Sequence, residues 1–237
     1  MIAITSISPT HIHADIQSKA IQSWMDLGME VISVNSPKEI EILETQYKKV
    51  RFIPTVRTLE KTYGKPYVQI SAIIDICKTL HSKHYCIINS DIELRSDIDT
   101  IKRIELKMSD NIILANRINH NGDYIGAKYL LGIDVFFIHQ RFLDYFPQSM
   151  HGLGMTFVDY FIPYSATKSG IQCVFIEQDF AYHKEHPAQY SSDNWKKSGR
   201  YFLWENNLYQ FNDTSQVGNM STFVYNYIYS ATTKETI

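Results

Sequence analysis

The sequence lacks the motifs by which many enzymes hold the phosphate groups of a nucleotide. No G-x-G-x-x-G follows an apolar run, and no G-x-x-x-x-G-K-[ST] occurs in the 237 residues. Their absence excludes the dinucleotide fingerprint and the P-loop. A ligand that carries phosphates must therefore be held in another way.

An excess of one charge, a set of paired cysteines and a long apolar run are also missing. The 23 basic and 25 acidic side chains leave a net charge of -2, so no overall positive field attracts nucleic acid or anionic lipid. Three cysteines at unrelated spacings cannot form a closed disulfide framework, and we expect buried thiols in a reducing compartment. No run reaches the ~18 apolar residues of a membrane span, and the N-terminus does not resemble a signal peptide. We therefore expect a cytoplasmic protein.

What is present is the composition of a globular protein. Hydrophobic residues make up 44% of the chain and charged residues 20%, which is too apolar for a disordered protein. No internal repeat and no linker-like tract divides the sequence. We expect one domain over residues 1–237.

Strands and helices alternate in the first half of the chain. Apolar, β-branched runs predict strands, and apolar residues three or four apart predict helices. The predicted strands are 2–7, 29–34, 50–56, 85–88 and 111–115, with helices at about 15–27, 37–47, 67–82 and 96–108 between them. Pro54 favours a sheet edge for its strand. This alternation predicts an α/β fold with a mostly parallel sheet, in which ligands bind beyond the carboxyl ends of the strands.

The second half is less regular. Two apolar runs predict strands at 134–138 and 172–176, with a helix at about 156–168 between them. The tail over 212–237 has few apolar anchors before Phe223, and we expect its end to be mobile.

A polar segment follows the buried strand that ends at Ile88. Asn89, Asp91 and Glu93 would project to one side if the strand alternation continued. A carboxylate at such a place is costly unless it meets a cation or hydrogen-bond donors. Oxygen ligands of this kind suit Mg²⁺ or Mn²⁺ bound together with a diphosphate. The alternative is that Asp91 caps the next turn.

A pair of histidines supplies the second candidate. His183 and His186 are three residues apart and would face one site if the segment turned helically. Imidazole binds Mn²⁺ as well as Zn²⁺, but no cysteine cluster and no H-E-x-x-H accompanies the pair to complete a zinc site.

The order of these segments resembles the glycosyltransferases of the GT-A fold. The resemblance covers about residues 2–195 and rests on the segments ITSISP, EVISVNS, GKPYVQI, YCIINSDIEL, GIDVFFI, TFVDYF and HKEHP in this order. It implies a nucleotide-sugar-binding half over about 1–116 and an acceptor half over about 117–211. In that family a nucleotide sugar lies across the ends of the first strands. A D-x-D-type motif after the fourth strand binds the metal and the diphosphate, and a later histidine often completes the metal site.

The resemblance assigns roles on the donor side to particular residues. Asn89 and Asp91 match the first and last positions of D-x-D, with Asp91 as the metal ligand and either His183 or His186 as the later histidine. Asn89 replaces an aspartate, which implies a lower metal affinity or no metal dependence. The remaining positions implied for nucleotide binding are Thr5, Ser6 and Ser8 at the nucleoside, Asn35 near the base and Lys65 at the base or a phosphate.

On the acceptor side the resemblance points to one carboxylate. Asp159, in Phe157-Val158-Asp159-Tyr160, matches the general base of inverting GT-A enzymes. Alternatively it is a favourable charge in the first turn of a helix. Asp134 is either a second carboxylate on this side or, as we favour, a structural residue at a strand start.

These features lead to three functional hypotheses. The first is a glycosyltransferase that uses a nucleoside-diphosphate sugar, most often a UDP-sugar in such folds, with Mn²⁺ or Mg²⁺. A nucleotidyltransferase of related fold is the second, and a catalytically silent module that binds a glycan or a partner is the third. The acceptor is left open among a glycan, a lipid-linked glycan, a protein and a modified base.

Overall fold

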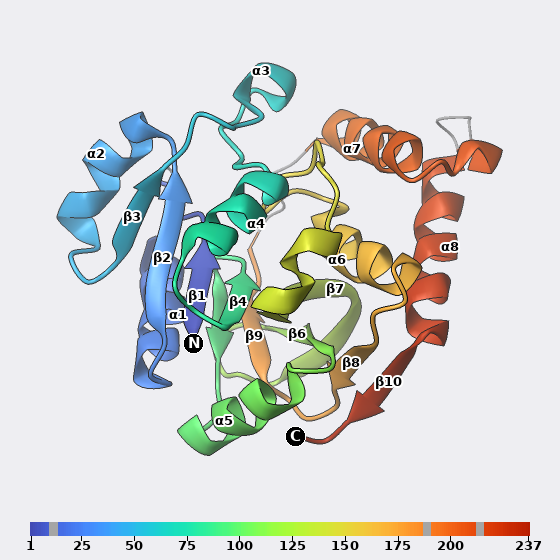
Figure 1. Cartoon of the computed structure of the whole chain (residues 1–237). Helices are drawn as coiled ribbons and strands as arrows, with labels where there is room; N and C mark the ends of the chain where they lie inside the picture. The colour runs from blue at the N-terminus through green and yellow to red at the C-terminus, as the bar shows by residue number, and fades with distance from the viewer. Residues whose placement is uncertain (10–13, 187–190, 212–215) are drawn as a thin grey trace.

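The computed structural model describes residues 1–9, 14–186, 191–211 and 216–237, and it is a mixed α/β structure (Figure 1). A twisted ten-stranded sheet carries helices on both faces. Its strands are β1 (Ile2–Thr5), β2 (Glu30–Asn35), β3 (Arg51–Pro54), β4 (His84–Ile88), β5 (Ile92–Leu94), β6 (Ile112–His120), β7 (Gly126–His139), β8 (Cys173–Ile176), β9 (Ala181–Lys184) and β10 (Thr232–Glu235).

The helices alternate with these strands through the first half of the chain and cluster in the second. They are α1 (Ala14–Asp26), α2 (Pro37–Gln46), α3 (Glu60–Tyr63), α4 (Ile70–Thr79), α5 (Ile98–Lys107), α6 (Val158–Lys168), α7 (Ser192–Glu205) and α8 (Val217–Ser230), with 3₁₀ turns η1 (Gln140–Tyr145) and η2 (Tyr209–Phe211). Within the described ranges, none of them is both long and apolar enough to cross a membrane.

The sheet is mostly parallel, as the alternation predicts. Its main path runs β10-β8-β6-β7-β4-β1-β2-β3, with β9 beside β6 and β5 beside β9. Strand β7 is antiparallel to both β4 and β6, and β5 is antiparallel to β9. The other pairings of the main path are parallel.

Both faces of the sheet are buried, which explains why its strands are continuous apolar runs. Ile2 and Ile4 of β1 lie in the core under α4, α6 and α8, whereas Ala3 lies in the core under α1 and α5. This alternation is the two-residue period of a strand. The three cysteines are buried free thiols, as expected.

Local sequence features fix the ends and edges of several elements. Ser36 and Glu39 form the capping box at the start of α2, and Gly28 has a φ of +79° after α1. Strand β3, which contains Pro54, lies at the edge of the sheet. Asp97 caps the start of α5, where its carboxylate accepts a hydrogen bond from Thr100 N at 2.7 Å.

The second half differs from its sequence-based outline in two ways. The predicted strands at 111–115 and 134–138 are only the inner parts of β6 and β7, which extend outward as a hairpin. The end of the chain packs on the body of the fold. Four side chains of α8 are buried, and β10 pairs with β8 (Figure 1). The expectation of a mobile end is therefore wrong for residues 216–237.

Candidate active site

The polar segments after β1, β2 and β4 meet at one edge of the sheet. Strand β1 is hydrogen-bonded in parallel to both β2 and β4, so the residues that follow these strands are neighbours. Thr5 ends β1 and Ser6 follows it, Asn35 ends β2, and Asn89 follows β4 directly. The structure thus brings most of the predicted donor-side positions to the edge where α/β sheets bind ligands.

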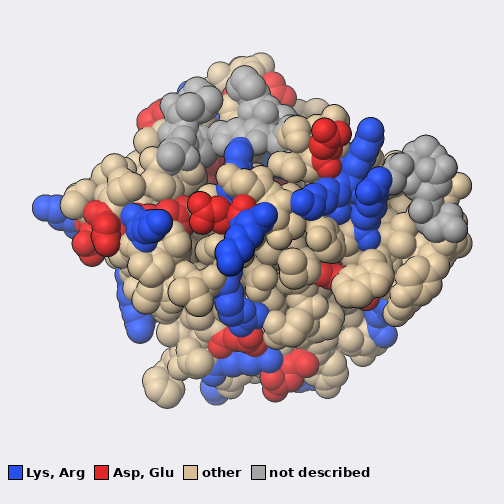
Figure 2. Space-filling view, turned by 90° about the horizontal axis from the view of Figure 1, so that it is seen from above, with Lys and Arg blue, Asp and Glu red and all other residues tan. Residues whose placement is uncertain are grey.

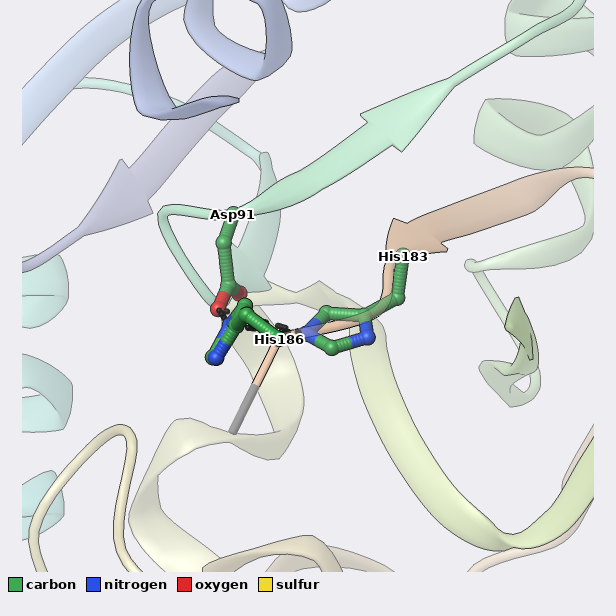
Figure 3. A group of neighbouring side chains, drawn as sticks. All are labelled: Asp91, His183 and His186. Carbon is green, nitrogen blue, oxygen red and sulfur yellow. Dashed lines mark hydrogen bonds and ion pairs between the residues drawn. The ribbon is translucent and has the colours of Figure 1, made fainter. Parts of the chain in front are cut away.

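Asp91, His183 and His186 form a compact group at this edge (Figure 3). Asp91 Oδ2 lies 3.5 Å from His183 Nε2 and 3.3 Å from His186 Nε2, and the two ring nitrogens are 3.2 Å apart. All three side chains are largely withdrawn from solvent, with 21%, 10% and 11% of their surface exposed.

The pairing of β5 with β9 creates this group. Ile92 lies opposite His183 in the antiparallel pair, which places Asp91, one residue earlier, beside the histidine. His183 therefore lies on a strand, and the pairing of strands, in place of a helical turn, brings the two histidines to one site. The structure nevertheless brings both histidine rings to the carboxylate, where a single histidine was expected.

The geometry of the group fits a metal ion. Ligand atoms at about 2.1 Å from a tetrahedral ion lie about 3.4 Å from one another, close to the three separations measured here. Without a cation, two Nε2 protons directed at one carboxylate oxygen would also lie against each other. A cation in their place removes this conflict, and two imidazoles with one carboxylate suit Mn²⁺ or Zn²⁺ better than Mg²⁺.

The electrostatics of Asp91 favour its ionised form. Burial raises the pKa of its carboxyl, but hydrogen bonds to His183 and His186 and their charge outweigh burial, so that the net pKa is lowered. His183 Nδ1 is buried and has no hydrogen-bond partner among the described residues.

Asn89 points to a different carboxylate. Its Nδ2 donates to Asp134 Oδ1 at 2.6 Å, and the other oxygen of Asp134 accepts from Arg117 Nη1 at 3.0 Å. Asp134, on β7, is only 5% exposed. The structural role that we favoured for Asp134 thus includes a direct contact with the predicted D-x-D segment.

Asp159 lies in the first turn of α6, and its Oδ1 is buried without a hydrogen-bond partner among the described residues. Burial and, next, the negative charge of Asp134 raise the pKa of its carboxyl to about 8, although the Arg117 guanidinium opposes the shift. Arg117 interacts electrostatically with Asp91, Asp134 and Asp159. The guanidinium therefore connects the histidine-bound carboxylate with the candidate base.

The other donor-side positions are held firmly by the fold. Thr5 is fully buried, and its hydroxyl has no partner among the described residues. Ser8 exchanges two backbone hydrogen bonds with the amide of Gln17. Asn35 is also buried and donates to Ile7 O at 2.8 Å, so it braces the end of β1. Lys65 lies in the connection between α3 and α4.

Two residues that the sequence analysis did not single out organise the site. Gln17 Oε1 accepts from both Ser8 N and Ser90 Oγ, which ties the segment after β1 to the segment after β4. Its only signal in the sequence is a polar residue beside Ile16 at the start of an amphipathic helix. Arg117 has no sequence signal, since it lies in the outer part of β6 that the apolar pattern does not reveal.

Basic side chains lie in the cavity beside Asp91 and on α7. A cavity of about 90 Å³ is lined by two lysines, Lys19 and Lys184, and by two carboxylates, Asp91 and Glu93. Figure 2 looks down on the upper end of the molecule in Figure 1 and shows Lys and Arg side chains over α7, which carries Lys196, Lys197 and Arg200. The basic side chains of α7 favour an anionic ligand on that face, whereas the lysines and carboxylates of the cavity balance each other.

Comparison with known proteins establishes the fold. No protein-family model and no curated protein matches the sequence. Among solved structures, TarS from S. aureus superposes with a TM-score of 0.51 at 11% identity, over 86% of this chain and 39% of TarS. A putative glucose-1-phosphate thymidylyltransferase from Bacillus anthracis superposes with a TM-score of 0.46 at 10% identity, over 76% of this chain and 87% of the other. HddC from Yersinia pseudotuberculosis, complexed with GMP-PN, superposes with a TM-score of 0.42 at 11% identity, over 85% of this chain and 100% of HddC.

The superposition on TarS supports the fold alone, and the GT-A-like fold expected from the order of the segments is confirmed. The chain spans about two fifths of the length of TarS.

Proposed function

We propose that the protein is a metal-assisted glycosyltransferase that takes a sugar from a nucleoside-diphosphate sugar, with UDP as the first nucleotide to test. The observation that carries this proposal is the triangle of Asp91, His183 and His186 at the ligand-binding edge of a GT-A-like sheet, with Arg117 connecting it to Asp159. The fold alone supports only a nucleotide-sugar-using enzyme. The residues at the edge supply the finer assignment.

Asp91, His183 and His186 would hold the cation through one oxygen and two ring nitrogens. A divalent ion at this place supplies positive charge to a leaving diphosphate. The ligand set favours Mn²⁺ over Mg²⁺ because imidazole is a better ligand for the softer ion. Lys19 and Lys184, which line the adjacent cavity, can offset charge on a phosphate beside the metal group.

Asp159 is proposed as the general base. Its carboxylate takes the proton of an acceptor hydroxyl, the acceptor oxygen forms a bond to the anomeric carbon, and the bond from that carbon to the diphosphate breaks. A pKa of about 8 makes its carboxylate a stronger base than an ordinary aspartate. Arg117 keeps part of the population ionised near neutral pH.

The nucleotide is proposed to lie along the ends of β1, β2 and β4. Thr5, Ser6 and Ser8 border that edge from β1, and Asn89 borders it from β4. Asn35 would act there through the backbone it braces, while Lys65 would approach from the α3–α4 connection. The acceptor is proposed to be a glycan, a lipid-linked glycan, a protein or a modified base, and the place of action to be the cytoplasm.

A thermal-shift screen tests the proposal. UDP, UDP-glucose, UDP-N-acetylglucosamine, GDP-mannose, dTDP-glucose, UTP and ATP are added with and without Mn²⁺, because a ligand that binds only the folded state raises the melting temperature. We expect a nucleotide-diphosphate sugar together with Mn²⁺ to give the largest rise. A larger rise with a nucleoside triphosphate would favour the nucleotidyltransferase, and no rise with any nucleotide would favour a silent binding module.

A further inference from the structure

Besides Thr5 Oγ1 and His183 Nδ1, two side-chain oxygens of the candidate site have no hydrogen-bond partner among the described residues. They are Asn89 Oδ1 and Asp159 Oδ1, and both atoms are buried. Buried polar atoms in native proteins are nearly always paired with protein, water or ligand. Each is coupled to Asp134: Asn89 by a hydrogen bond of 2.6 Å and Asp159 by electrostatic repulsion. Asn89 Oδ1 can only accept, so a ligand that satisfies it must bring a donor, as the hydroxyl groups of a sugar do.

The orientation of the Asn89 amide is fixed by its neighbours. Its Nδ2 donates to Asp134 Oδ1, and its backbone N–H donates to the carbonyl of Asp134 at 3.3 Å. Arg117 Nη1 holds the second carboxylate oxygen of Asp134, and Arg117 Nε donates to Asn119 Oδ1 at 3.0 Å. Since Nδ2 is engaged, the amide can offer only its oxygen to a ligand.

An aspartate at position 89 would not fit this arrangement. It would place a carboxylate oxygen of residue 89 about 2.6 Å from a carboxylate oxygen of Asp134. Arg117 would then be the cation that offsets both negative charges. Like charges at such a distance cannot both remain ionised without a large cost. The aspartate at position 134 therefore requires an uncharged donor such as asparagine at position 89.

We propose that Asp134 is a positioning residue that supplies, from β7, the carboxylate absent from position 89, and that it directs Asn89 Oδ1 to accept a hydrogen bond from a hydroxyl of the donor sugar. This inference rests on the proposed function, because it assumes that the site binds a nucleotide sugar. It assigns to the Asn89–Asp134 pair the sugar moiety, and leaves the metal to Asp91 and the two histidines.

An exchange of the two side chains tests the pair. In the double variant Asn89→Asp/Asp134→Asn, the amide introduced on β7 can donate to the carboxylate introduced after β4 and still accept from Arg117. Every hydrogen bond is then kept, and the net charge is unchanged. Each single variant instead leaves two carboxylates or two amides face to face. Asn226→Asp, an exposed position on α8, is the matched control.

Calorimetry with Mn²⁺ present in every titration measures the dissociation constants of UDP and of UDP-glucose or UDP-N-acetylglucosamine. The measured quantity is the ratio of the dissociation constant of UDP to that of the UDP-sugar. We expect each single variant to reduce this sugar contribution several-fold to about tenfold, the double variant to recover it, and the UDP affinity to change little. Melting temperature is recorded on the same samples, because a purely structural pair would change stability without changing the ratio.

Three results would overturn the inference. Single variants with an unchanged ratio exclude a role for the pair in sugar binding. A double variant that regains the melting temperature but not the ratio shows that the pair only stabilises the fold. A wild type that binds UDP with Mn²⁺ but gains nothing from the sugar removes the inference alone, whereas a wild type that binds none of these nucleotides removes the proposed function with it.

Discussion

Asp91 and Asp159 are two carboxylates of one site whose surroundings shift their pKa values in opposite directions. Both are partly buried, and burial is the largest single influence on each. Two histidines face Asp91, so the net pKa of its carboxyl falls. Asp159 has Asp134 as its strongest charged neighbour, and the pKa of its carboxyl rises to about 8. The comparison teaches that the neighbours, more than burial, separate a group suited to hold a cation from a group suited to accept a proton.

The largest effect is expected from removing the charge of Asp159. Asp159→Asn keeps the shape of the side chain but cannot accept a proton, so we expect transfer to fall by ~10² to 10⁴-fold with little change in donor affinity. Wild-type turnover should rise with pH up to about 8, where Asp159 becomes ionised. The turnover number and melting temperature are measured on one preparation.

The control for this variant is Asp144→Asn, whose side chain is 86% exposed. If Asp159→Asn turned over as fast as wild type, Asp159 would be eliminated as the base. The two carboxylates would then differ in pKa without differing in chemical role, and a retaining mechanism, which needs no such base, would gain weight.

The next effect in size concerns Asp91. Asp91→Ala removes the oxygen ligand, and we expect the Mn²⁺-dependent part of UDP binding to weaken by about 100-fold or more, since even indirect partners of a metal ligand contribute about 10 to 100-fold. Calorimetry with UDP at fixed Mn²⁺ measures the change. Asp99→Ala, at an exposed ion pair on α5, is the control. Equal UDP affinity in the variant and wild type, with metal in both, would show that Asp91 is not a ligand.

The histidines test whether the triangle acts as a unit. Because both Nε2 atoms lie within 3.5 Å of Asp91 Oδ2, we expect His183→Ala and His186→Ala each to lower Mn²⁺ affinity by about 10 to 100-fold. Titration of Mn²⁺ followed by electron paramagnetic resonance measures this affinity, with exposed His81→Ala as the control. An effect in one variant alone would restore a single histidine ligand, and an effect in neither would remove the metal assignment from both.

The sequence predicts some strands of the sheet fully and others only in part. The strands β1, β2, β4 and β8 are apolar runs buried on both faces, and such runs identify themselves without any knowledge of their partners. The outer parts of β6 and β7 are mixed in polarity, because only their inner residues reach the core. The sequence therefore predicts only the inner part of the hairpin formed by β6 and β7.

The sequence predicts several residues of the candidate site, but it does not predict the contacts between them. Asp91 and Asp159 could be identified from their places after a strand and at a helix start. That His183 and His186 face Asp91 together depends on the pairing of β5 with β9, and the contact of His186 with Asp91 spans 95 residues. The bond from Asn89 to Asp134 spans 45 residues, so no local pattern could show why an asparagine stands at that position.

A further prediction, on stability, isolates the pKa of Asp159 from any assumption about substrate. The folded-state pKa of this carboxyl, about 8, lies above the unfolded value of ~3.9, so the native state holds the proton more tightly. This group therefore favours folding fully below about pH 4, and its contribution is lost as pH rises through about 8. In EDTA, the wild-type free energy of unfolding by urea should fall between about pH 5 and 8 more steeply than that of Asp159→Asn. Asp144→Asn should keep the wild-type slope. Parallel curves for wild type and Asp159→Asn would show that Asp159 titrates as an ordinary carboxyl, and the opposition between the two carboxylates would then rest on Asp91 alone.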